Sequence, residues 1–402
     1  MEKDRILKME KRQRVPSTRA FIIQSALLWS CVPLLYSFLP VYLSGIGFHE
    51  SRIGIIMALG PLMAAVLQPF IGVAVDRSNL KNTILMLLTG GSVISILLFP
   101  LNKVYLYVLI ISIILAAFQS ALTSTSETIT LESLDAMKKP YGPVRAFGTI
   151  GYSLVSIIVG ILMKWDIRNI FYVTAIIGLL GMVSVSFLPK VRGHQSEGNH
   201  IAIKELFQDK LLIVFMLFSM MAQLAISFYQ TFFPIYFASI GGTEGQLGVL
   251  YFIMAICELP FLLLSGKIIK KLGIQLTLVL SMGVIAVRFI LLYLIKSPLW
   301  IYPVSMLHGL TFIVFSFSLA VYINKTAKKE LRATGQTIHG FISMGLGRIL
   351  GSVLGGFLIE GFGLLNVMLF AFALCVVSIV FFIAFCAVIR RTPGSKLPVY
   401  SD

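Results

Sequence analysis

Eight ionisable residues fall within or at the edge of long apolar runs, where charged side chains are rare. A charged group at the centre of a bilayer costs roughly 2.5 to 3.5 kcal/mol on insertion scales, so such residues should pair across helices or face water. Acids in a low-dielectric cavity are also able to exchange protons. Solute binding, proton transfer and purely structural ion pairs all remain open for these residues. They are Glu127, Glu132, Arg145, Glu258, Arg288, His308, His339 and Arg348.

The composition indicates that membrane helices position these residues. The 402 residues are 57% hydrophobic and 12% charged, and the mean hydropathy is +0.92. These values exclude a water-soluble fold. The formal charge of +16 comes from basic residues in short clusters between apolar runs, which favours orientation in a membrane over nucleic-acid binding.

Apolar runs of about 18 to 25 residues predict twelve membrane-spanning helices. Twelve spans put both termini on one side, and only five Lys or Arg residues lie in the segments on the other side (Arg52, Lys103, Lys164, Arg168 and Lys296). The positive-inside rule therefore predicts a multi-pass protein of the cell membrane with both termini in the cytoplasm. The predicted spans are residues 20–43, 53–75, 83–101, 104–126, 144–163, 170–188, 211–239, 246–266, 274–295, 299–323, 333–359 and 364–389.

One long interior connection separates six spans from the other six. It contains glycine and serine and then a short amphipathic stretch, which is typical of a cytoplasmic linker with an interfacial helix. The expected organisation is a basic cytoplasmic N-terminus (1–19), a six-helix bundle (20–188), the linker (189–210), a second six-helix bundle (211–389) and a cytoplasmic tail (390–402).

An internal repeat supports this division. At one offset of 194 residues, Pro40, Tyr42, Ile46, Gly47, Gly54, Gly72 and Arg77 match Pro234, Tyr236, Ile240, Gly241, Gly248, Gly266 and Lys271. A parallel duplication of this kind is typical of transporters whose halves rock about a site near the bilayer midplane. Gly347, Gly351 and Gly355 recur every four residues, and both close helix packing and a hinge or sliding role remain open for them.

A short loop motif stands after the second span of each half. Its residues are Gly72, Asp76, Arg77 and Lys81 in the first half and Gly266 and Lys271 in the second. The motif resembles the signature loop of the major facilitator superfamily, in which glycine allows close packing and a charge network latches the helix ends. This chain departs from that pattern at Asn79, Leu80 and Lys270. The resemblance implies an all-α membrane fold of twelve helices in two pseudo-symmetric six-helix bundles, with these residues as a gating loop.

The intramembrane charges resemble, in span order, those of the lactose permease type of proton symporter and its nucleoside and phenylpropionate relatives. That resemblance implies that Glu127, Arg145, Tyr152 and Glu258 bind the substrate. It also implies that Glu258, Arg288 and His308 couple protons to transport. One departure concerns the acid expected one turn after the histidine, because Thr311 stands there.

The expected function is secondary active transport of a small polar solute (a sugar, nucleoside or aromatic acid), with protons as the coupled ion. Export of amphipathic compounds and a non-transporting membrane sensor are the alternatives. We expect no enzyme activity, cofactor or metal, because no phosphate-binding loop, nucleophile elbow or zinc-ligand spacing occurs. The expected partners are the solute, protons and the lipid bilayer, with the protein as a monomer. Trp29 is expected to pack or face lipid, and Arg348 to reach the membrane interface.

Overall fold

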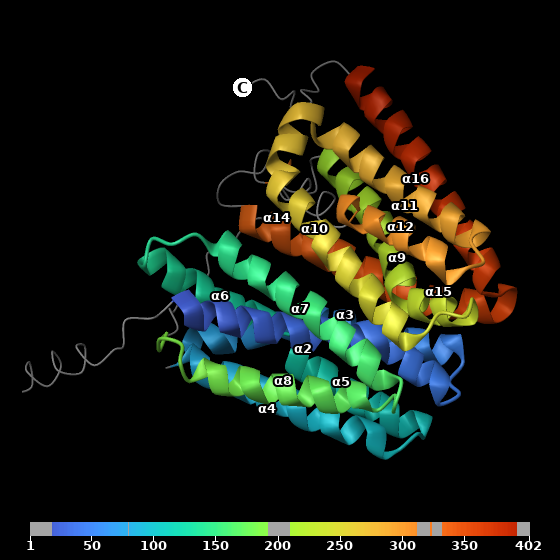
Figure 1. Cartoon of the computed structure of the whole chain (residues 1–402). Coiled ribbons are helices and arrows are strands. Elements are labelled where there is room, and N and C mark those ends of the chain that lie inside the picture. The colour runs from blue at the N-terminus through green and yellow to red at the C-terminus, as the bar shows by residue number, and fades with distance from the viewer. Residues whose placement is uncertain (1–17, 79, 192–209, 312–321, 324–331, 392–402) are drawn as a thin grey trace, which may run out of the picture. The chain divides into compact units, whose positions relative to one another are not determined.

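The computed structural model describes residues 18–78, 80–191, 210–311, 322–323 and 332–391, and every regular element within these ranges is helical (Figure 1). The elements up to residue 191 are α2 (Thr18–Gly45), α3 (Glu50–Arg77), α4 (Lys81–Leu98), η1 (Phe99–Leu101), α5 (Tyr105–Gln119), α6 (Leu122–Ala136), α7 (Tyr141–Met163) and α8 (Asn169–Val185). Those after residue 209 are α9 (Lys210–Ser239), α10 (Glu244–Leu272), α11 (Ile274–Leu294), α12 (Pro298–Met306), η3 (Leu307–Leu310), α14 (Arg332–His339), η5 (Gly340–Gly347), α15 (Arg348–Phe362) and α16 (Leu364–Arg391). For the described residues the predicted all-α class is confirmed.

Ten helical segments in the described ranges are long and apolar enough to cross a membrane. Of the two other predicted spans, one coincides with α8, an apolar helix of 17 residues. The other, 299–323, is described only up to Thr311 and again at Tyr322 and Ile323. The predicted N-terminal segment up to residue 17, the linker from 192 to 209 and the tail from 392 lie outside the described residues.

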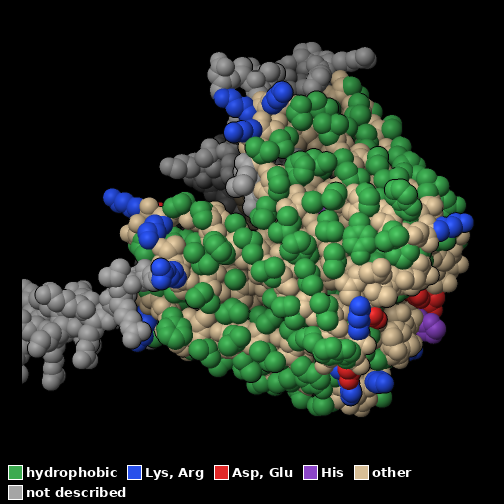
Figure 2. All heavy atoms as spheres, in the orientation of Figure 1, with side chains coloured by type: hydrophobic (Ala, Val, Ile, Leu, Met, Phe, Trp, Pro, Cys, Tyr) green, Lys and Arg blue, Asp and Glu red, His purple; other side chains and the backbone are tan. Residues whose placement is uncertain are grey.

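Apolar side chains remain exposed along the helices, as expected for a protein whose solvent is lipid. Phe70 and Phe381 are each 72% exposed, and many other large apolar residues are more than half exposed. Figure 2 shows hydrophobic side chains over most of the visible surface, with Lys and Arg gathered near helix ends. A surface of this kind is incompatible with water and suits a hydrocarbon environment.

The chain divides into two compact units. Unit 1 comprises Met1–Leu35 and Met63–Glu197, and unit 2 comprises Tyr36–Leu62 and Gly198–Asp402. The division passes through α2 and α3, so the tip of this helical hairpin (residues 36–62) packs within unit 2. The bundle boundaries at residues 188 and 211 were predicted from the ends of apolar runs and not from contacts, and they stay a prediction.

The hairpin tip packs closely on two helices of unit 2. The Tyr251 hydroxyl of α10 donates a hydrogen bond to the carbonyl oxygen of Ser37 (2.8 Å). On α15, the carbonyl oxygen of Ser352 lies where a Cβ at Gly54 would be, and the carbonyl of Glu50 lies where a Cβ at Gly356 would be. These two glycines therefore allow backbone to pack directly on backbone.

Gly347, which directly precedes α15, and Gly351 within α15 pack against α9. A Cβ on Gly351 would overlap the carbonyl oxygen of Leu224, and one on Gly347 would lie 2.8 Å from that of Met220. Beside this contact, the Ser227 hydroxyl hydrogen-bonds the carbonyl of Arg348 and the hydroxyl of Ser352 (both 2.9 Å). The glycine repeat thus forms a close helix seam, which supports the packing interpretation without testing the hinge.

The internal repeat recurs in the backbone. After α2, the amide of Gly47 donates to the carbonyl of Ser44, and after α9 the amide of Gly241 donates to that of Ala238 (both 3.0 Å). Both glycines have positive φ, +91° and +88°. Helices α3 and α10 then begin at Glu50 and Glu244, again 194 residues apart. The duplicated hairpins therefore share their turn geometry as well as their sequence.

Helix α6 continues past the predicted end of the fourth span at residue 126. Its sequence is rich in Ser and Thr, and their hydroxyls donate to backbone carbonyls three or four residues earlier, as from Thr128 to Ser124 (2.8 Å) and from Ser133 to Ile129 (2.7 Å). This back-bonding satisfies the polar side chains inside the helix. The predicted span ended at residue 126 because the hydropathy of the sequence falls there, although the helix continues to Ala136. Glu127 and Glu132 both lie within this helix.

Candidate functional site

Glu127 and Arg145 lie together in unit 1, on the neighbouring helices α6 and α7. The Arg145 Nε lies 4.0 Å from the Glu127 Oε1, and the Tyr141 hydroxyl donates a hydrogen bond of 3.0 Å to the same oxygen. Arg145 also donates through Nη1 to the Thr149 hydroxyl (3.4 Å). The two charged side chains are 28% and 37% exposed. The contact is therefore loose enough for polar atoms of a ligand to bind either group.

Trp29 of α2 stacks on Arg145, with the guanidinium carbon 3.6 Å from the centre of the indole ring. The approach depends on Gly148, where a Cβ would lie 2.8 Å from the Trp29 ring, and on Gly151, where it would lie 2.8 Å from the carbonyl of Ala26. A cation over an indole face is held electrostatically. Trp29 thus belongs to the candidate site, a role that the sequence analysis missed in favour of packing or lipid contact.

Tyr152 is half-buried on α7, seven residues after Arg145. Two helical turns place both residues on the same helix face. Tyr152 therefore lies on the same face of α7 as Arg145, although Trp29 is the aromatic residue that contacts the guanidinium.

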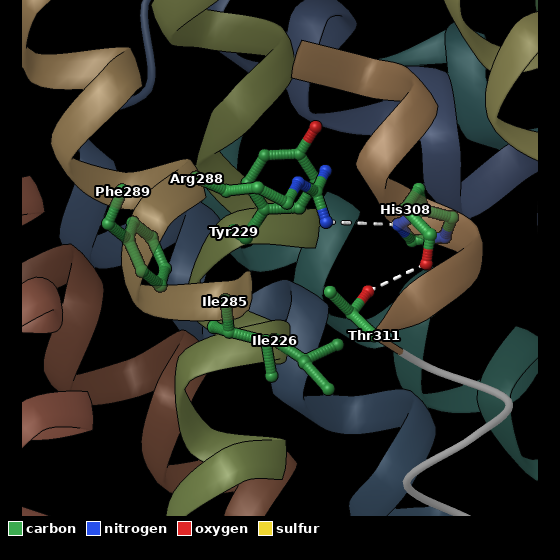
Figure 3. Close-up of a pocket in the computed structure, with 7 residues that line it drawn as sticks. All are labelled: Ile226, Tyr229, Ile285, Arg288, Phe289, His308 and Thr311. Carbon is green, nitrogen blue, oxygen red and sulfur yellow. Dashed lines mark hydrogen bonds between the residues drawn. The ribbon is translucent and has the colours of Figure 1, made fainter. Parts of the chain in front are cut away.

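In unit 2 the structure brings two of the three predicted coupling residues together around a small cavity (Figure 3). The Arg288 Nη1 lies 3.2 Å from the His308 Nδ1, and the Arg288 guanidinium carbon lies 4.2 Å from the centre of the Tyr229 ring. The hydroxyl of Thr311 donates to the carbonyl of His308 (2.7 Å). Ile226, Ile285 and Phe289 supply the apolar part of the wall.

Glu258, the third residue, is half-buried on α10. Its helix packs closely on η3, because Gly309 lies directly against the carbonyl of Cys257. Glu258 and His308 therefore lie on neighbouring elements. Glu258 follows Cys257 in α10, and His308 precedes Gly309 in η3. The described hydrogen bond of Arg288 is with His308.

The first copy of the loop motif forms a charge cluster at the start of α4. Lys81 is 1% exposed, and its Nζ lies 2.6 Å from the Glu132 Oε1 and 3.9 Å from the Asp76 Oδ1. The neighbouring Asn82 hydrogen-bonds both the carbonyl of Pro189 and the amide of Val191 (3.1 Å each), which ties α4 to the segment after α8. The motif lysine is therefore buried between two acids, one from α3 and one from α6.

The other motif residues are less constrained. Arg77, Gly266 and Lys271 are exposed, and a Cβ added to Gly72 or to Gly266 would meet no atom within 4 Å. Neither glycine forms a close helix contact in this structure, and their role in the gating loop stays a prediction. Asn79 lies outside the described residues, whereas Gly273, its equivalent in the repeat, has a φ of +76° that favours glycine.

Arg348 differs from its expected position. It begins α15 inside a continuous helical stretch, and its Nε donates to the Gln223 Oε1 of α9 (3.3 Å). The residue therefore links two helices rather than reaching the membrane interface. In the described part of the chain, no three His, Cys, Asp or Glu side chains come together as a metal site.

These features define a class of protein: an all-helical, multi-span membrane protein with polar and charged groups inside its helical units. A family model described as the MFS_1 like family matches residues 24–372, and the chain belongs to this family. It is a major facilitator superfamily transporter and not an enzyme.

The relatives and solved structures agree with this assignment. The chain is 26% identical to the uncharacterized transporter YwbF of Bacillus subtilis over 82% of this chain and 83% of that protein. It is 24% identical to the maltose permease of Geobacillus stearothermophilus, over 90% and 92%. A crystal structure of a mutant of the nucleoside transporter NupG has a TM-score of 0.84 at 19% identity, covering 91% of this chain and 99% of that one. The predicted resemblance to the sugar and nucleoside symporter branch is confirmed.

Proposed function

We propose that the chain is a secondary active transporter that moves a sugar or nucleoside across the cell membrane by proton symport and alternating access. The relatives that are named permeases or transporters of such solutes support the substrate class. Twelve spans in two six-helix halves would form the scaffold, with α8 and the segment that begins at α12 added to the ten long apolar helices. Both termini would lie in the cytoplasm.

The group formed by Glu127, Arg145 and Trp29 carries the proposal. A carboxylate accepts hydrogen bonds from sugar hydroxyls, a guanidinium donates two hydrogen bonds from one edge, and an indole offers a flat apolar face. A polyhydroxylated ring can use all three kinds of contact, and the three side chains lie together in unit 1. Tyr152 would belong to the same group, and Glu258 of unit 2 is a further proposed substrate-binding residue.

Proton coupling would depend on Glu258, Arg288 and His308. The hydroxyl of Thr311 donates to the backbone and supplies no acid, so Glu258 or Glu127 would carry the proton. The cluster of Asp76, Lys81 and Glu132 would act as the cytoplasmic gate, together with Gly72, Arg77, Gly266 and Lys271. Its ion pairs would have to separate when the gate opens.

Uptake into proteoliposomes tests this function. The purified protein is reconstituted with and without an imposed inward proton gradient, and uptake is measured for a panel of radiolabelled sugars and nucleosides. We expect one solute to accumulate with the gradient and to lose accumulation when a protonophore is added. Accumulation that survives the protonophore would reject the coupling, and lack of movement of every sugar and nucleoside would reject the substrate class.

Trp29→Ala is expected to raise the KM for the transported solute about 10-fold. The substitution removes the ring that holds Arg145 in place, and a cation–π contact is worth roughly 0.5 to 2 kcal/mol, where 1.4 kcal/mol is tenfold in affinity. Trp29→Phe should keep most of the affinity because it keeps a flat ring. Trp165→Ala removes an indole that is 79% exposed and serves as the control. A KM that is unchanged in Trp29→Ala would remove this residue from the site.

A further inference from the structure

The end of α10 carries three lysines on one helix face, Lys267, Lys270 and Lys271, referred to below as the α10 lysines. All three side chains are exposed. Figure 2 shows basic side chains at the top of the view, where α10 ends and α11 begins in Figure 1. Residues three and four apart are neighbours on a helix, and like charges at this spacing repel one another. The cluster is therefore unfavourable unless an anion lies against it.

This cluster replaces the mixed charges that the first copy of the loop motif has. In the internal repeat, Lys270 stands where the first copy has Asp76, and Gln275 stands where it has Lys81. The carboxylate of Asp76 and the ammonium of Lys81 lie 3.9 Å apart, whereas the second copy has neither member of this pair. The second copy therefore cannot form the same ion pair, and its charge is entirely positive.

The α10 lysines take part in none of the ion pairs that the described residues form. Lys81, Arg145 and Arg168, in contrast, each have an acid within 4.0 Å. The last acid of α10 is Glu258, nine residues before Lys267 and about 14 Å away along the helix axis. That separation exceeds the Debye length of about 8 Å at physiological salt. The charge of the cluster is therefore available to a ligand from outside the protein.

The length of α10 brings its lysines to the membrane surface. The helix has 29 residues and a length of about 43 Å, more than the roughly 30 Å of a hydrocarbon core. The predicted span also ends at Gly266, directly before Lys267. Leu264 lies three residues earlier on the same face and is 44% exposed, and Leu276 near the start of α11 is 48% exposed. Apolar side chains thus lie beside the lysines, as the acyl and phosphate parts of one phospholipid require.

We propose that the α10 lysines bind the phosphate headgroup of an anionic phospholipid, whose acyl chains lie against Leu264. An ammonium binds phosphate as a point charge, and an anionic membrane surface attracts each lysine near it. The proposal goes beyond sugar or nucleoside transport and does not rest on it, because lipid binding to the folded protein is measurable without any solute.

Thermal unfolding of the purified protein in an uncharged detergent tests the lipid site. Ligand binding to the folded state stabilises it by mass action, so we expect added phosphatidylglycerol to raise Tm by roughly 2 to 4 °C until the response saturates. High salt should weaken this response because it screens exposed charges. Phosphatidylcholine, which has no net charge, should leave Tm unchanged. An equal rise with phosphatidylcholine, or with soluble glycerol 3-phosphate, would overturn the proposal.

Two double variants connect the response to the α10 lysines. Lys267→Gln with Lys270→Gln should raise the phosphatidylglycerol concentration at the midpoint of the response by about 10- to 30-fold, since each lysine near an anionic surface contributes about fivefold in affinity. Lys164→Gln with Lys296→Gln removes the same charge from exposed positions outside the cluster and should leave the midpoint unchanged. An unchanged midpoint in the first variant, or an equal shift in both, would contradict the site.

Discussion

Arg145→Gln is expected to lower solute uptake by about 10- to 100-fold in reconstituted proteoliposomes. A hydrogen bond to a charged group is worth roughly 1.5 to 3 kcal/mol, and each 1.4 kcal/mol is a factor of ten. The substitution also leaves Glu127 without its nearby cation and Trp29 without the group that it covers. Arg145→Lys should fail as well, because an ammonium has neither the two-pronged edge nor the flat face.

A double variant separates a binding role from a structural one. If Glu127 and Arg145 only neutralise each other, Glu127→Gln combined with Arg145→Gln should restore uptake, because no unpaired charge remains. If both contact the solute, the double variant should be as inactive as either single one. Arg168→Gln, in the exposed turn between α7 and α8, is the control, and its pairing with Asp166 should not matter for uptake. Restored uptake in the double variant would contradict the proposed binding site.

Gly351→Ala is expected to reduce the stability of the protein by about 1 to 3 kcal/mol, the usual cost of overpacking. The new Cβ would overlap the carbonyl oxygen of Leu224 and lie 3.0 Å from the Cβ of Ser227. Backbone atoms cannot move aside as a flexible side chain can, so α9 and α15 would have to separate. That separation would also stretch the hydrogen bond between Ser227 and Ser352. Thermal unfolding in detergent measures the loss as a lower Tm.

Gly361→Ala is the matched control on the same helix. A Cβ at Gly361 would meet no atom within 4 Å, and alanine favours helix more than glycine does. Its Tm should be equal to or higher than that of the wild-type protein. Equal Tm values for Gly351→Ala and Gly361→Ala would contradict the close seam. A normal Tm with lost uptake in Gly351→Ala would instead favour the hinge interpretation of this glycine.

The pattern of apolar residues predicted most of the fold. Most described helices that span an apolar run begin and end within a few residues of the prediction, because hydrocarbon thickness limits helix length. Helices α6 and α10 are the exceptions, since they continue past the predicted ends at residues 126 and 266. The internal repeat could also be predicted from the sequence, because Gly47 and Gly241 stand in turns whose positive φ favours glycine. The proximity of Glu127 and Arg145 followed from the resemblance, and the structure brings the two residues together.

Partners from distant segments could not be predicted in the same way. Lys81 is buried against Glu132, 51 residues later, and no local pattern specifies which acid a lysine will meet. Trp29 lies in an apolar run like many packing residues, and its contact with Arg145 depends on how closely α2 approaches α7 at Gly148. Which nitrogen atoms of Arg288 form hydrogen bonds, as Nη1 does with His308, is likewise a property of the folded structure.

The back-bonded hydroxyls of α6 have a consequence for the biosynthesis of the chain. Helix α5 has 15 residues and a length of about 22 Å, less than the roughly 30 Å of a hydrocarbon core. A nascent chain that has emerged only as far as Gln119 therefore lacks a complete fourth crossing. The first part of α6 must follow α5 into the bilayer, and hydroxyls already bonded to their own helix lower the cost of that entry. The back-bonded serine and threonine residues of α6 thus lower the cost of bringing Glu127 to the end of the fourth crossing.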